Sequence, residues 1–262
     1  MSFDGQLPIY VINLARSVER WQAIEQSALA HQLTLTRVDA VDGHTIKRED
    51  WQDFDVGEFG RRNGRTALAG EYGCYMSHLH AIEAFVQSGM PAGVILEDDV
   101  ELVADFDAKV RAILASLPQN SLVKLVHYRL GGFLKVADVY SGIRVGACAF
   151  GPEGSAAAYA LTRSAAIKLL KALKPMSLPY DVALGRGWAN GVRVYNVTDN
   201  VLPMFQGGNS PSNIVVGTDY GQLKWKKWRR IPAYLFRICE DLRRIVHAGV
   251  CWVFPARSKA KL

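Results

Sequence analysis

Three consecutive acidic residues, Glu97, Asp98 and Asp99, follow directly after the apolar run Val94-Ile95-Leu96. The run predicts a buried strand, and a strand core cannot hold three carboxylates without a large desolvation cost. We therefore expect the acids at the carboxyl end of the strand, where open α/β sheets bind ligands. Carboxylate oxygens suit Mg²⁺ or Mn²⁺, either of which can stabilise negative charge on a departing diphosphate. The alternative is a solvated acidic loop that caps the next helix.

The order of the three acids suggests separate roles. Alternate residues of an extended backbone point to opposite sides, so Glu97 and Asp99 should face one way and Asp98 the other. We predict that Asp99 is a metal ligand and that Glu97 lies beside it, on the metal or the ribose. Asp98 is expected to be structural more than catalytic.

The elements that must position this cluster are predicted to form one α/β domain with a mainly parallel, Rossmann-like sheet flanked by helices. The apolar runs predict strands at 8–14, 35–41, 94–96, 121–127, 156–161 and 192–197. Helical spacing predicts helices after Ser17, from after Gly73 to about Ser88, over 106–117 and after Thr162. Residues 44–69 are expected to form a long excursion or lid, and the Gly/Ser/Asn-rich stretch 206–221 to be mobile.

Charge is distributed unevenly along the chain. The formal net charge is +6, but residues 223–262 hold eleven Lys/Arg and two Asp/Glu, or +9, which leaves −3 for the remainder. We therefore divide the chain into a domain at 1–222 and a basic, aromatic tail at 223–262. The start of the chain lacks the features of a secretory signal, and no apolar stretch is long enough to span a membrane, so we expect a cytoplasmic protein. The four scattered cysteines are expected to be buried thiols.

The tail interleaves basic residues with Trp225 and Trp228, and apolar residues then recur at helical spacing. This pattern is typical of an amphipathic helix that lies on an anionic membrane surface. The alternative is a C-terminal helix packed on the domain. No nucleic-acid-binding module accompanies the basic residues, so no nucleic-acid partner is expected.

Several segments, in their order and spacing, resemble glycosyltransferase family 25, which includes lipooligosaccharide galactosyl- and glucosyltransferases and collagen galactosyltransferase domains. The resemblance covers roughly residues 8–215, and the segments that carry it are Tyr10–Leu14 with Arg16, Ser17 and Arg20, then Val38–Gly43, Gly70–Cys74 with Ser77–Leu79, Ile95–Val100, Ala158–Arg163 and Pro179–Asp181.

This resemblance implies a GT-A-type fold and a metal-dependent, inverting transfer of galactose or glucose from a UDP-sugar, with Mn²⁺ or Mg²⁺. It also implies a lipid-linked oligosaccharide acceptor of the lipopolysaccharide or lipooligosaccharide core. A basic tail suits such an acceptor, so we expect peripheral attachment to the cytoplasmic face of the inner membrane. Ala15 departs from the polar residue often found there, and no His follows Asp181 until His247, so a late histidine metal ligand is not evident.

The resemblance also suggests which residues bind the donor. Asn13 and Leu14 end the first strand beside the expected uridine, and Arg16 and Arg20 lie one turn apart, within reach of the base or a phosphate. The arginines could instead form a solvated helix face, and His78 could be a structural histidine. The full set of expected donor-binding residues is Asn13, Leu14, Arg16, Arg20, Val41, Asp42, Gly43, Glu71, Gly73, Ser77, His78, Glu97, Asp98 and Gln206.

An inverting transfer needs a general base that takes the proton of the acceptor hydroxyl. We predict Asp181, which follows Pro179-Tyr180 at the start of an expected helix, and name Glu153 as the second choice. The alternative role for Asp181 is to cap that helix. Two other functions compete: a metal-dependent hydrolase of a phosphate or glycoside, and a non-catalytic sugar-binding module with a transferase-like fold.

Overall fold

The computed structural model describes residues 5–139, 142–203 and 223–254. These residues form eight strands, which are β1 (Ile9–Asn13), β2 (Leu35–Asp39), β3 (Ala92–Glu97), β4 (Ser121–Lys124), β5 (Gly131–Asp138), β6 (Arg144–Phe150), β7 (Ala158–Thr162) and β8 (Arg193–Val197). The helices are α1 (Val18–Ala30), α2 (Val56–Asn63), α3 (Ala69–Gln87), α4 (Phe106–Ala115), α5 (Arg163–Ala172), α6 (Tyr180–Leu184), α7 (Gly187–Asn190) and α8 (Ile231–Val253), with short 3₁₀ turns at Gly43–Thr45, Arg48–Asp50 and Lys227–Arg230.

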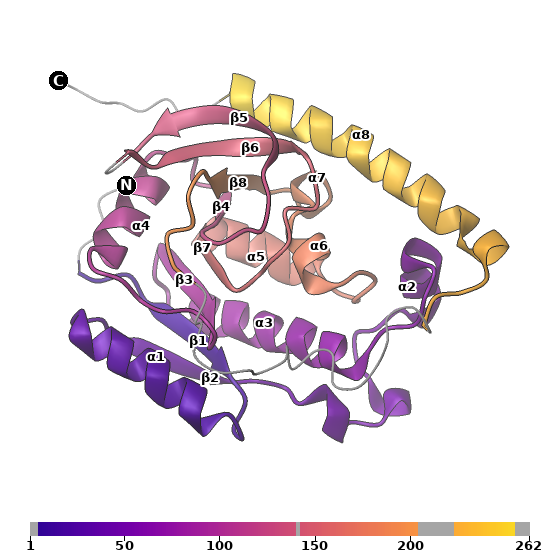
Figure 1. Cartoon of the computed structure of the whole chain (residues 1–262), viewed down its shortest axis with the longest axis horizontal. Helices are drawn as coiled ribbons and strands as arrows, with labels where there is room; N and C mark the ends of the chain where they lie inside the picture. Colours follow the sequence, from indigo (N-terminus) through magenta and orange to yellow (C-terminus); the bar gives the residue numbers. More distant parts are fainter. Residues whose placement is uncertain (1–4, 140–141, 204–222, 255–262) are drawn as a thin grey trace.

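All eight strands join one sheet in the order β2-β1-β3-β7-β4-β8-β6-β5 (Figure 1). The pairings β1/β2, β1/β3 and β4/β8 are parallel, whereas β7 is antiparallel to β3 and β4, and β6 is antiparallel to β8 and β5. Six strands therefore share one direction, and only β6 and β7 oppose it. The prediction of a mainly parallel α/β sheet of the GT-A type is confirmed.

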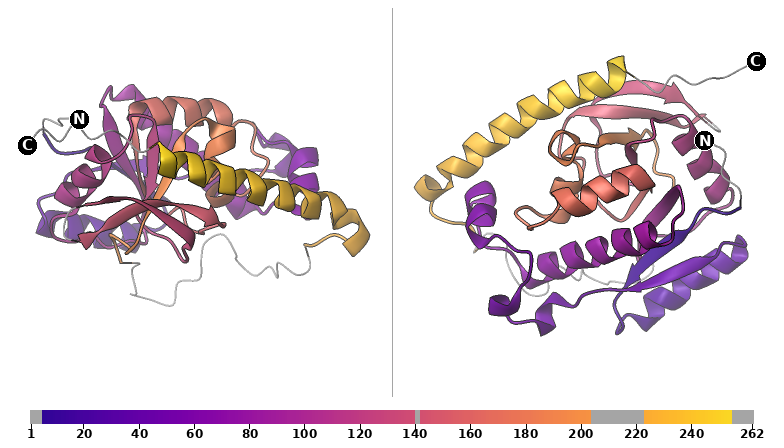
Figure 2. Two further views of the ribbon diagram at one scale, coloured as in Figure 1. Left: turned by 90° about the horizontal axis from the view of Figure 1, so that it is seen from above. Right: turned by 180° about the vertical axis from the view of Figure 1, so that it is seen from behind.

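The central strands are apolar on both faces because helices cover both faces (Figure 2). Val94 and Leu96 of β3 belong to a core cluster that also contains apolar residues of α1 and α4. Ile95, between them, belongs to a second cluster on the opposite face with residues of α3 and α5. Strands buried on both faces read as continuous apolar runs, which explains why the sequence revealed β1 and β3 clearly.

The structure differs from the sequence prediction in two places: it contains an additional hairpin, and the segment expected to be an irregular excursion contains helical structure. Strands β5 and β6 form an antiparallel hairpin at the sheet edge, with an irregular register between Lys135 and Ala137. Their many small residues and the irregular register obscure the alternation that marks a strand. The stretch 44–69, expected to be an excursion, contains two 3₁₀ turns and the helix α2, whose Asp55 side chain accepts a hydrogen bond from the Glu58 amide.

Helix α8 lies against the hairpin edge of the sheet, where it contacts β6 most extensively and also β5, α2 and α7 (Figure 1). Its buried residues are Ala233, Glu240, Arg244, Ala248 and Cys251. The alternative reading of the tail, a helix packed on the domain, therefore describes 231–253 correctly. Within the described ranges, no helix combines the length and apolarity needed to cross a membrane.

Candidate active site

A crevice opens at the carboxyl ends of β1, β2 and β3, beside the first half of α3. It is lined by Ile12, Leu14, Arg16, Arg20, Ala40, Val41, Asp42, Gly43, His44, Gly70, Cys74, Ser77, His78, Glu97, Asp98 and Asp99. Eleven of these were predicted from the sequence as donor or metal residues. Because the three strands are parallel neighbours, their ends meet at one edge and bring together residues distant in the chain.

The acidic cluster begins at the last residue of β3, and the chain turns immediately after Glu97. Asp98 is directed at the β1–α1 connection, where its Oδ2 accepts a 2.6 Å hydrogen bond from Asn13 Nδ2 and its Oδ1 lies 3.1 Å from Arg20 Nη1. Asp98 thus ties the ends of β1 and β3 together. This contact gives Asp98 and Asn13 supporting positions, and Asn13 does not line the crevice.

Asp99 has surroundings that favour a bound cation. Its Oδ1 is buried and has no hydrogen-bond partner among the described residues. Burial, followed by the charges of Glu97 and Asp98, raises the pKa of Asp99 to about 7, and Arg20 opposes this only in part. A divalent cation would supply the missing partner and relieve the repulsion among the carboxylates. The donor set of Asp99 and Glu97 therefore fits Mg²⁺ or Mn²⁺.

His78 is fully buried and fixes the Glu97 side chain. Its Nε2 lies 3.1 Å from Glu97 Oε1, and its Nδ1 lies 3.2 Å from the hydroxyl of Tyr159. That hydroxyl is 2.8 Å from the hydroxyl of Tyr180, whose ring stacks on the imidazole at 4.0 Å. Both ring nitrogens are occupied, so the contacts assign His78 to positioning Glu97.

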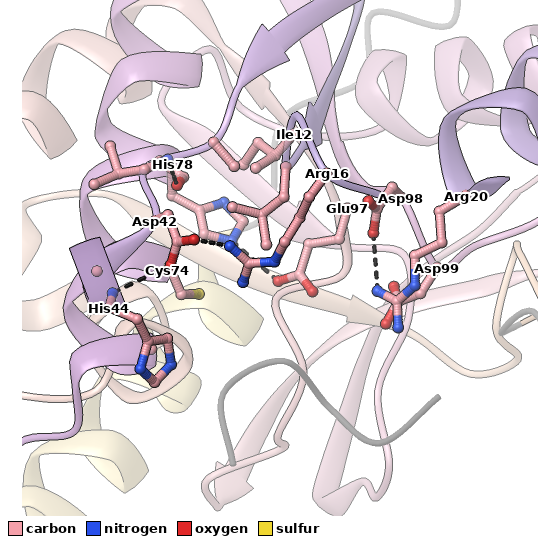
Figure 3. A pocket seen from close by; sticks show the side chains of 16 residues that line it. Ile12, Arg16, Arg20, Asp42, His44, Cys74, His78, Glu97, Asp98 and Asp99 are labelled. Carbon is pink, nitrogen blue, oxygen red and sulfur yellow. Dashed lines mark hydrogen bonds and ion pairs between the residues drawn. The ribbon is translucent and has the colours of Figure 1, made fainter. Parts of the chain in front are cut away.

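Two arginines of the crevice are paired with acids across it (Figure 3). Arg16 forms an ion pair with Asp42, and Arg20 pairs with Asp98. In the view of Figure 3, the Glu97 carboxylate lies between these two pairs. The Arg16 side chain is half exposed, so its guanidinium can leave Asp42 for an incoming anion at low cost.

The loop after β2 packs tightly on α3. A Cβ atom on Gly73 would lie 2.4 Å from the Val41 carbonyl oxygen, and one on Gly43 would lie 1.9 Å from the Ala69 carbonyl oxygen. Ser77 Oγ accepts a 2.8 Å hydrogen bond from the Val41 amide. Gly73 does not line the crevice, so its small size serves this close packing, which shapes the crevice wall.

Glu71 also lies outside the crevice lining. It is buried, accepts a 2.9 Å hydrogen bond from the Leu68 amide at the start of α3, and forms an ion pair with Arg65. These contacts give it a role in anchoring α3. Gln206, the remaining predicted donor residue, lies outside the described residues.

The two residues predicted as general bases have different surroundings. Asp181 is half-buried in the first turn of α6. Burial is the main cause of the raised pKa values of Cys74 and Tyr128, and the charges of Glu97, Asp99 and Asp181 raise them further. Asp181 is therefore a source of negative charge near Cys74 and Tyr128, but it does not line the crevice. Glu153 is buried between Arg244 Nη1 at 3.2 Å and Lys124 Nζ at 3.7 Å. That ionic cluster occupies Glu153 in contacts that hold the fold.

Several residues near the site were missed or not assigned a role. Cys74, one turn before His78, forms a group with His78 and Glu97 whose ligand atoms lie within 4.8 Å of one another. Burial, followed by the charge of Glu97, holds the Cys74 pKa well above its usual value, so the thiol stays protonated. Most of the Tyr128 side chain is exposed. Partial burial, followed by the charges of Asp99, Glu97 and Asp181, raises the pKa of its hydroxyl. The spacing of Cys74 to His78 marks a shared helix face, whereas nothing local in the sequence marks Tyr128.

Comparison with known proteins identifies the half of the chain that forms the crevice. The model of "Glycosyltransferase family 25 (LPS biosynthesis protein)" matches residues 6–137, which is half of the chain. A probable inactive glycosyltransferase 25 family member 3 of Rattus norvegicus is 31% identical over 126 residues, covering 47% of this chain and 22% of that protein.

Two galactosyltransferases match the chain to a similar extent. Procollagen galactosyltransferase 1 of Danio rerio is 22% identical, and procollagen galactosyltransferase 2 of Homo sapiens is 24% identical, each over 47% of this chain and 20% of the relative. The chain thus matches about a fifth of the length of these relatives.

Proposed function

Because the chain belongs to glycosyltransferase family 25, we propose that it is a metal-dependent, inverting glycosyltransferase that moves galactose or glucose from a UDP-sugar. The proposed acceptor is a lipid-linked oligosaccharide of a lipopolysaccharide or lipooligosaccharide core. The reaction then takes place at the cytoplasmic face of the inner membrane. The family match shows a glycosyltransferase of family 25, and we propose the sugar donor, the metal ion and the acceptor.

The observation that carries this proposal is the buried, unpartnered Asp99 oxygen beside Glu97, in a crevice that also contains Arg16 and Arg20. A site that collects carboxylates and arginines around one space is suited to a metal-bound diphosphate, in which both charge signs meet. Asp99 and Glu97 would hold the ion, and the ion would supply Lewis-acid stabilisation of the departing UDP. His78 holds Glu97 in position for this task.

The protein's own groups divide the remaining work. The apolar Ile12 and Leu14 form a wall of the crevice against which a uracil ring can lie. Arg16, which is half exposed, can exchange Asp42 for a donor phosphate. Ile12 lies in β1, and Leu14 and Arg16 lie on the β1–α1 connection. We therefore expect the nucleotide to lie across the ends of β1 and β2, where parallel sheets bind ligands.

We favour Asp181 over Glu153 as the general base. Inversion requires that the acceptor hydroxyl attacks the anomeric carbon from the side opposite the leaving group while its proton passes to a carboxylate. Asp181 is half-buried, and no side-chain hydrogen bond or ion pair of its carboxylate is seen among the described residues, so this carboxylate is available to take a proton. Glu153 is held between two buried cations and would have to abandon both. The exposed ring of Tyr128 offers the acceptor sugar a surface near Asp99 and Asp181.

A non-catalytic role is the second candidate, since one of the matching relatives is named as probably inactive. Loss of the metal ligands would be the expected mark of such a protein, and this chain retains Glu97 and Asp99. A glycoside hydrolase is less consistent with the site, because its two carboxyls must stand apart across the bond and not follow one another along the chain.

The deciding experiment is a donor screen. Thermal shift and donor hydrolysis would be measured for UDP-galactose, UDP-glucose and their N-acetyl forms, each with and without Mn²⁺. We expect one UDP-hexose to stabilise the protein and to be hydrolysed slowly, only when Mn²⁺ is present. Stabilisation without any hydrolysis or transfer would support the non-catalytic alternative, and metal-independent turnover would refute the metal site.

A further inference from the structure

Helix α8 packs on the domain through a face that combines the small residues Ala233, Ala248 and Cys251 with two charged residues. Glu240 and Arg244 are 6% and 5% exposed, although both are charged. Glu240 forms an ion pair with Arg186, and Arg244 reaches Glu153. The His247 Nε2 lies 3.4 Å from the Val194 amide of β8. Charged side chains on a surface helix usually point to solvent, so the burial of Glu240 and Arg244 is unusual and is explained by their ion pairs with the domain.

The face turned away from the domain is apolar. Seven exposed apolar residues recur at spacings of one to seven positions that keep them on one side of the helix. They are Ile231, Leu235, Ile238, Leu242, Ile245, Val246 and Val253. Trp228 lies exposed before the helix begins, and Trp252 and Phe254 are exposed near its end. We call this surface the apolar stripe. At 23 residues, the helix is about 35 Å long, so the stripe is too large to be a scatter of single surface residues.

The positive charge around the apolar stripe indicates which kind of partner can bind it. Residues 223–254 contain eight Lys/Arg and only two Asp/Glu. One of the two acids, Glu240, is buried in its ion pairs. A second copy of this chain packed stripe to stripe would bring arginines such as Arg237 and Arg243 against one another, with few exposed acids to offset them. Anionic lipid headgroups would instead meet these cations with opposite charge.

We propose that the apolar stripe of α8 is a docking surface for an anionic lipid bilayer, on which the helix lies flat. Its apolar residues enter the boundary between headgroups and acyl chains, the aromatic residues at both ends lie at headgroup depth, and the flanking Lys and Arg contact lipid phosphates. Because the inward face of α8 is joined to the domain by buried ion pairs, the helix binds as a fixed part of the molecule. Bilayer binding fixes the orientation of the whole domain.

The test compares vesicle binding by the full chain and three variants. Flotation would be measured with vesicles of phosphatidylglycerol and phosphatidylcholine, and with phosphatidylcholine alone. We expect the wild type to float with the anionic vesicles and the double variant Leu235→Glu/Leu242→Glu to bind them at least about tenfold more weakly. Leu29→Glu is the matched control, since Leu29 is 71% exposed on α1 and Leu242 is 61% exposed on α8. This control should bind like the wild type.

A third variant, Lys226→Gln/Lys227→Gln/Arg237→Gln, should lose the preference for anionic over neutral vesicles while keeping the stripe. The proposal is overturned if the wild type stays unbound to anionic vesicles, or if Leu29→Glu loses binding as fully as the double variant. It is also overturned if sedimentation velocity without lipid shows a dimer that Leu242→Glu abolishes, because the stripe would then bind a second copy. Circular dichroism and the UDP-sugar thermal shift should be unchanged in all variants, so that this outcome is independent of the proposed transfer reaction.

Discussion

At the scale of single residues, three adjacent acids have three different environments. Asp98 is satisfied by Asn13 and Arg20, and Glu97 is held by His78. Asp99 is the member of this trio whose buried Oδ1 has no hydrogen-bond partner among the described residues. Sequence alternation suggested this division, but the chain turns after Glu97, so the real cause is the turn and the partners on neighbouring strands.

The first prediction concerns Asp99. Asp99→Ala should reduce metal-dependent transfer by about a hundredfold or more, because the ion loses a ligand at the site of developing charge. Initial rates over a Mn²⁺ titration would measure this loss. Glu101→Ala is the control, since Glu101 is an exposed acid two residues away, and it should retain wild-type rates. A fully active Asp99→Ala enzyme would move the metal to other ligands.

The second prediction separates binding from chemistry. Asp181→Asn should bind the UDP-sugar with unchanged affinity but turn over about 10²- to 10⁴-fold more slowly, because the amide cannot accept the acceptor's proton. Isothermal titration and single-turnover rates would report the two steps. Glu153→Gln should mainly lower stability. If instead it lowered turnover in a stably folded protein while Asp181→Asn had no effect, the base would be Glu153.

At the scale of elements, buried ionic contacts join segments that are distant in the chain. Lys124 of β4 has its Nζ 3.4 Å from the Gly154 carbonyl oxygen and 3.4 Å from the Asp181 carbonyl oxygen, and 3.7 Å from Glu153 Oε2. Arg244 of α8 contacts Glu153 from the other side. This cluster fixes the loop before β7, the start of α6 and the middle of α8 in one arrangement.

The third prediction follows from that cluster. Arg244→Ala should lower the free energy of unfolding by about 3–5 kcal/mol, because Glu153 would keep its charge in the interior with only the more distant Lys124 opposite. Arg243→Ala, at the neighbouring and exposed position, should cost less than about 1 kcal/mol. Urea unfolding of the two variants would measure the difference. Equal losses would show that the cluster adds nothing to stability.

Much of this arrangement could be predicted from the sequence, and the exceptions have physical reasons. The ends of β1 and β3 were predicted to within one residue, near Asn13 and Glu97, because buried parallel strands produce clear apolar runs. The second strand was expected to reach Val41, but β2 ends at Asp39, and its partly exposed residues give a weaker pattern. The roles of Glu71 and Glu153 could not be read from the sequence, since their partners Arg65 and Arg244 were not identifiable there. The hairpin β5–β6 was omitted because its small residues and irregular register weaken the strand pattern.

At the scale of the whole molecule, the crevice and α8 lie toward opposite ends of the sheet. The crevice is built on β2, β1 and β3, and α8 packs on β6, β5 and β8. The family match covers the crevice half of the chain, through residue 137. The half beyond residue 137 contains Asp181 and the apolar stripe. In our proposal, the first half therefore binds the donor and the second half contacts the acceptor and the bilayer.

The fourth prediction concerns acid stability. Burial, followed by the charges of Arg193 and Arg244, lowers the pKa of His247 from 6.5 to about 4, and its Nε2 accepts from the Val194 amide. Because the folded-state pKa is the lower one, the unfolded chain binds the proton first. Stability is therefore complete above about pH 6.5 and falls toward pH 4, by at most about 1.4 kcal/mol per pH unit for this group.

Urea unfolding at pH 7 and pH 5 would check this sign. The wild type should lose more stability over that interval than His247→Gln, in which no imidazole can be protonated. His31→Gln, at an exposed position, should behave like the wild type. If His247→Gln showed the same acid sensitivity as the wild type, other groups would account for it.

The contact between Arg244 and Glu153 joins residues 91 positions apart, and this affects how the gene can change. A nonsense or frameshift mutation before Leu223 would remove α8 and leave Glu153 buried without its arginine, so the product would be a poorly folded chain and not a freely diffusing enzyme. Recombination at this junction would fail for the same reason, unless the incoming segment brought its own cation to Glu153. The inward positions of α8 must therefore be inherited together with the sheet, whereas its outward positions can drift within the limits that the proposed bilayer contact sets.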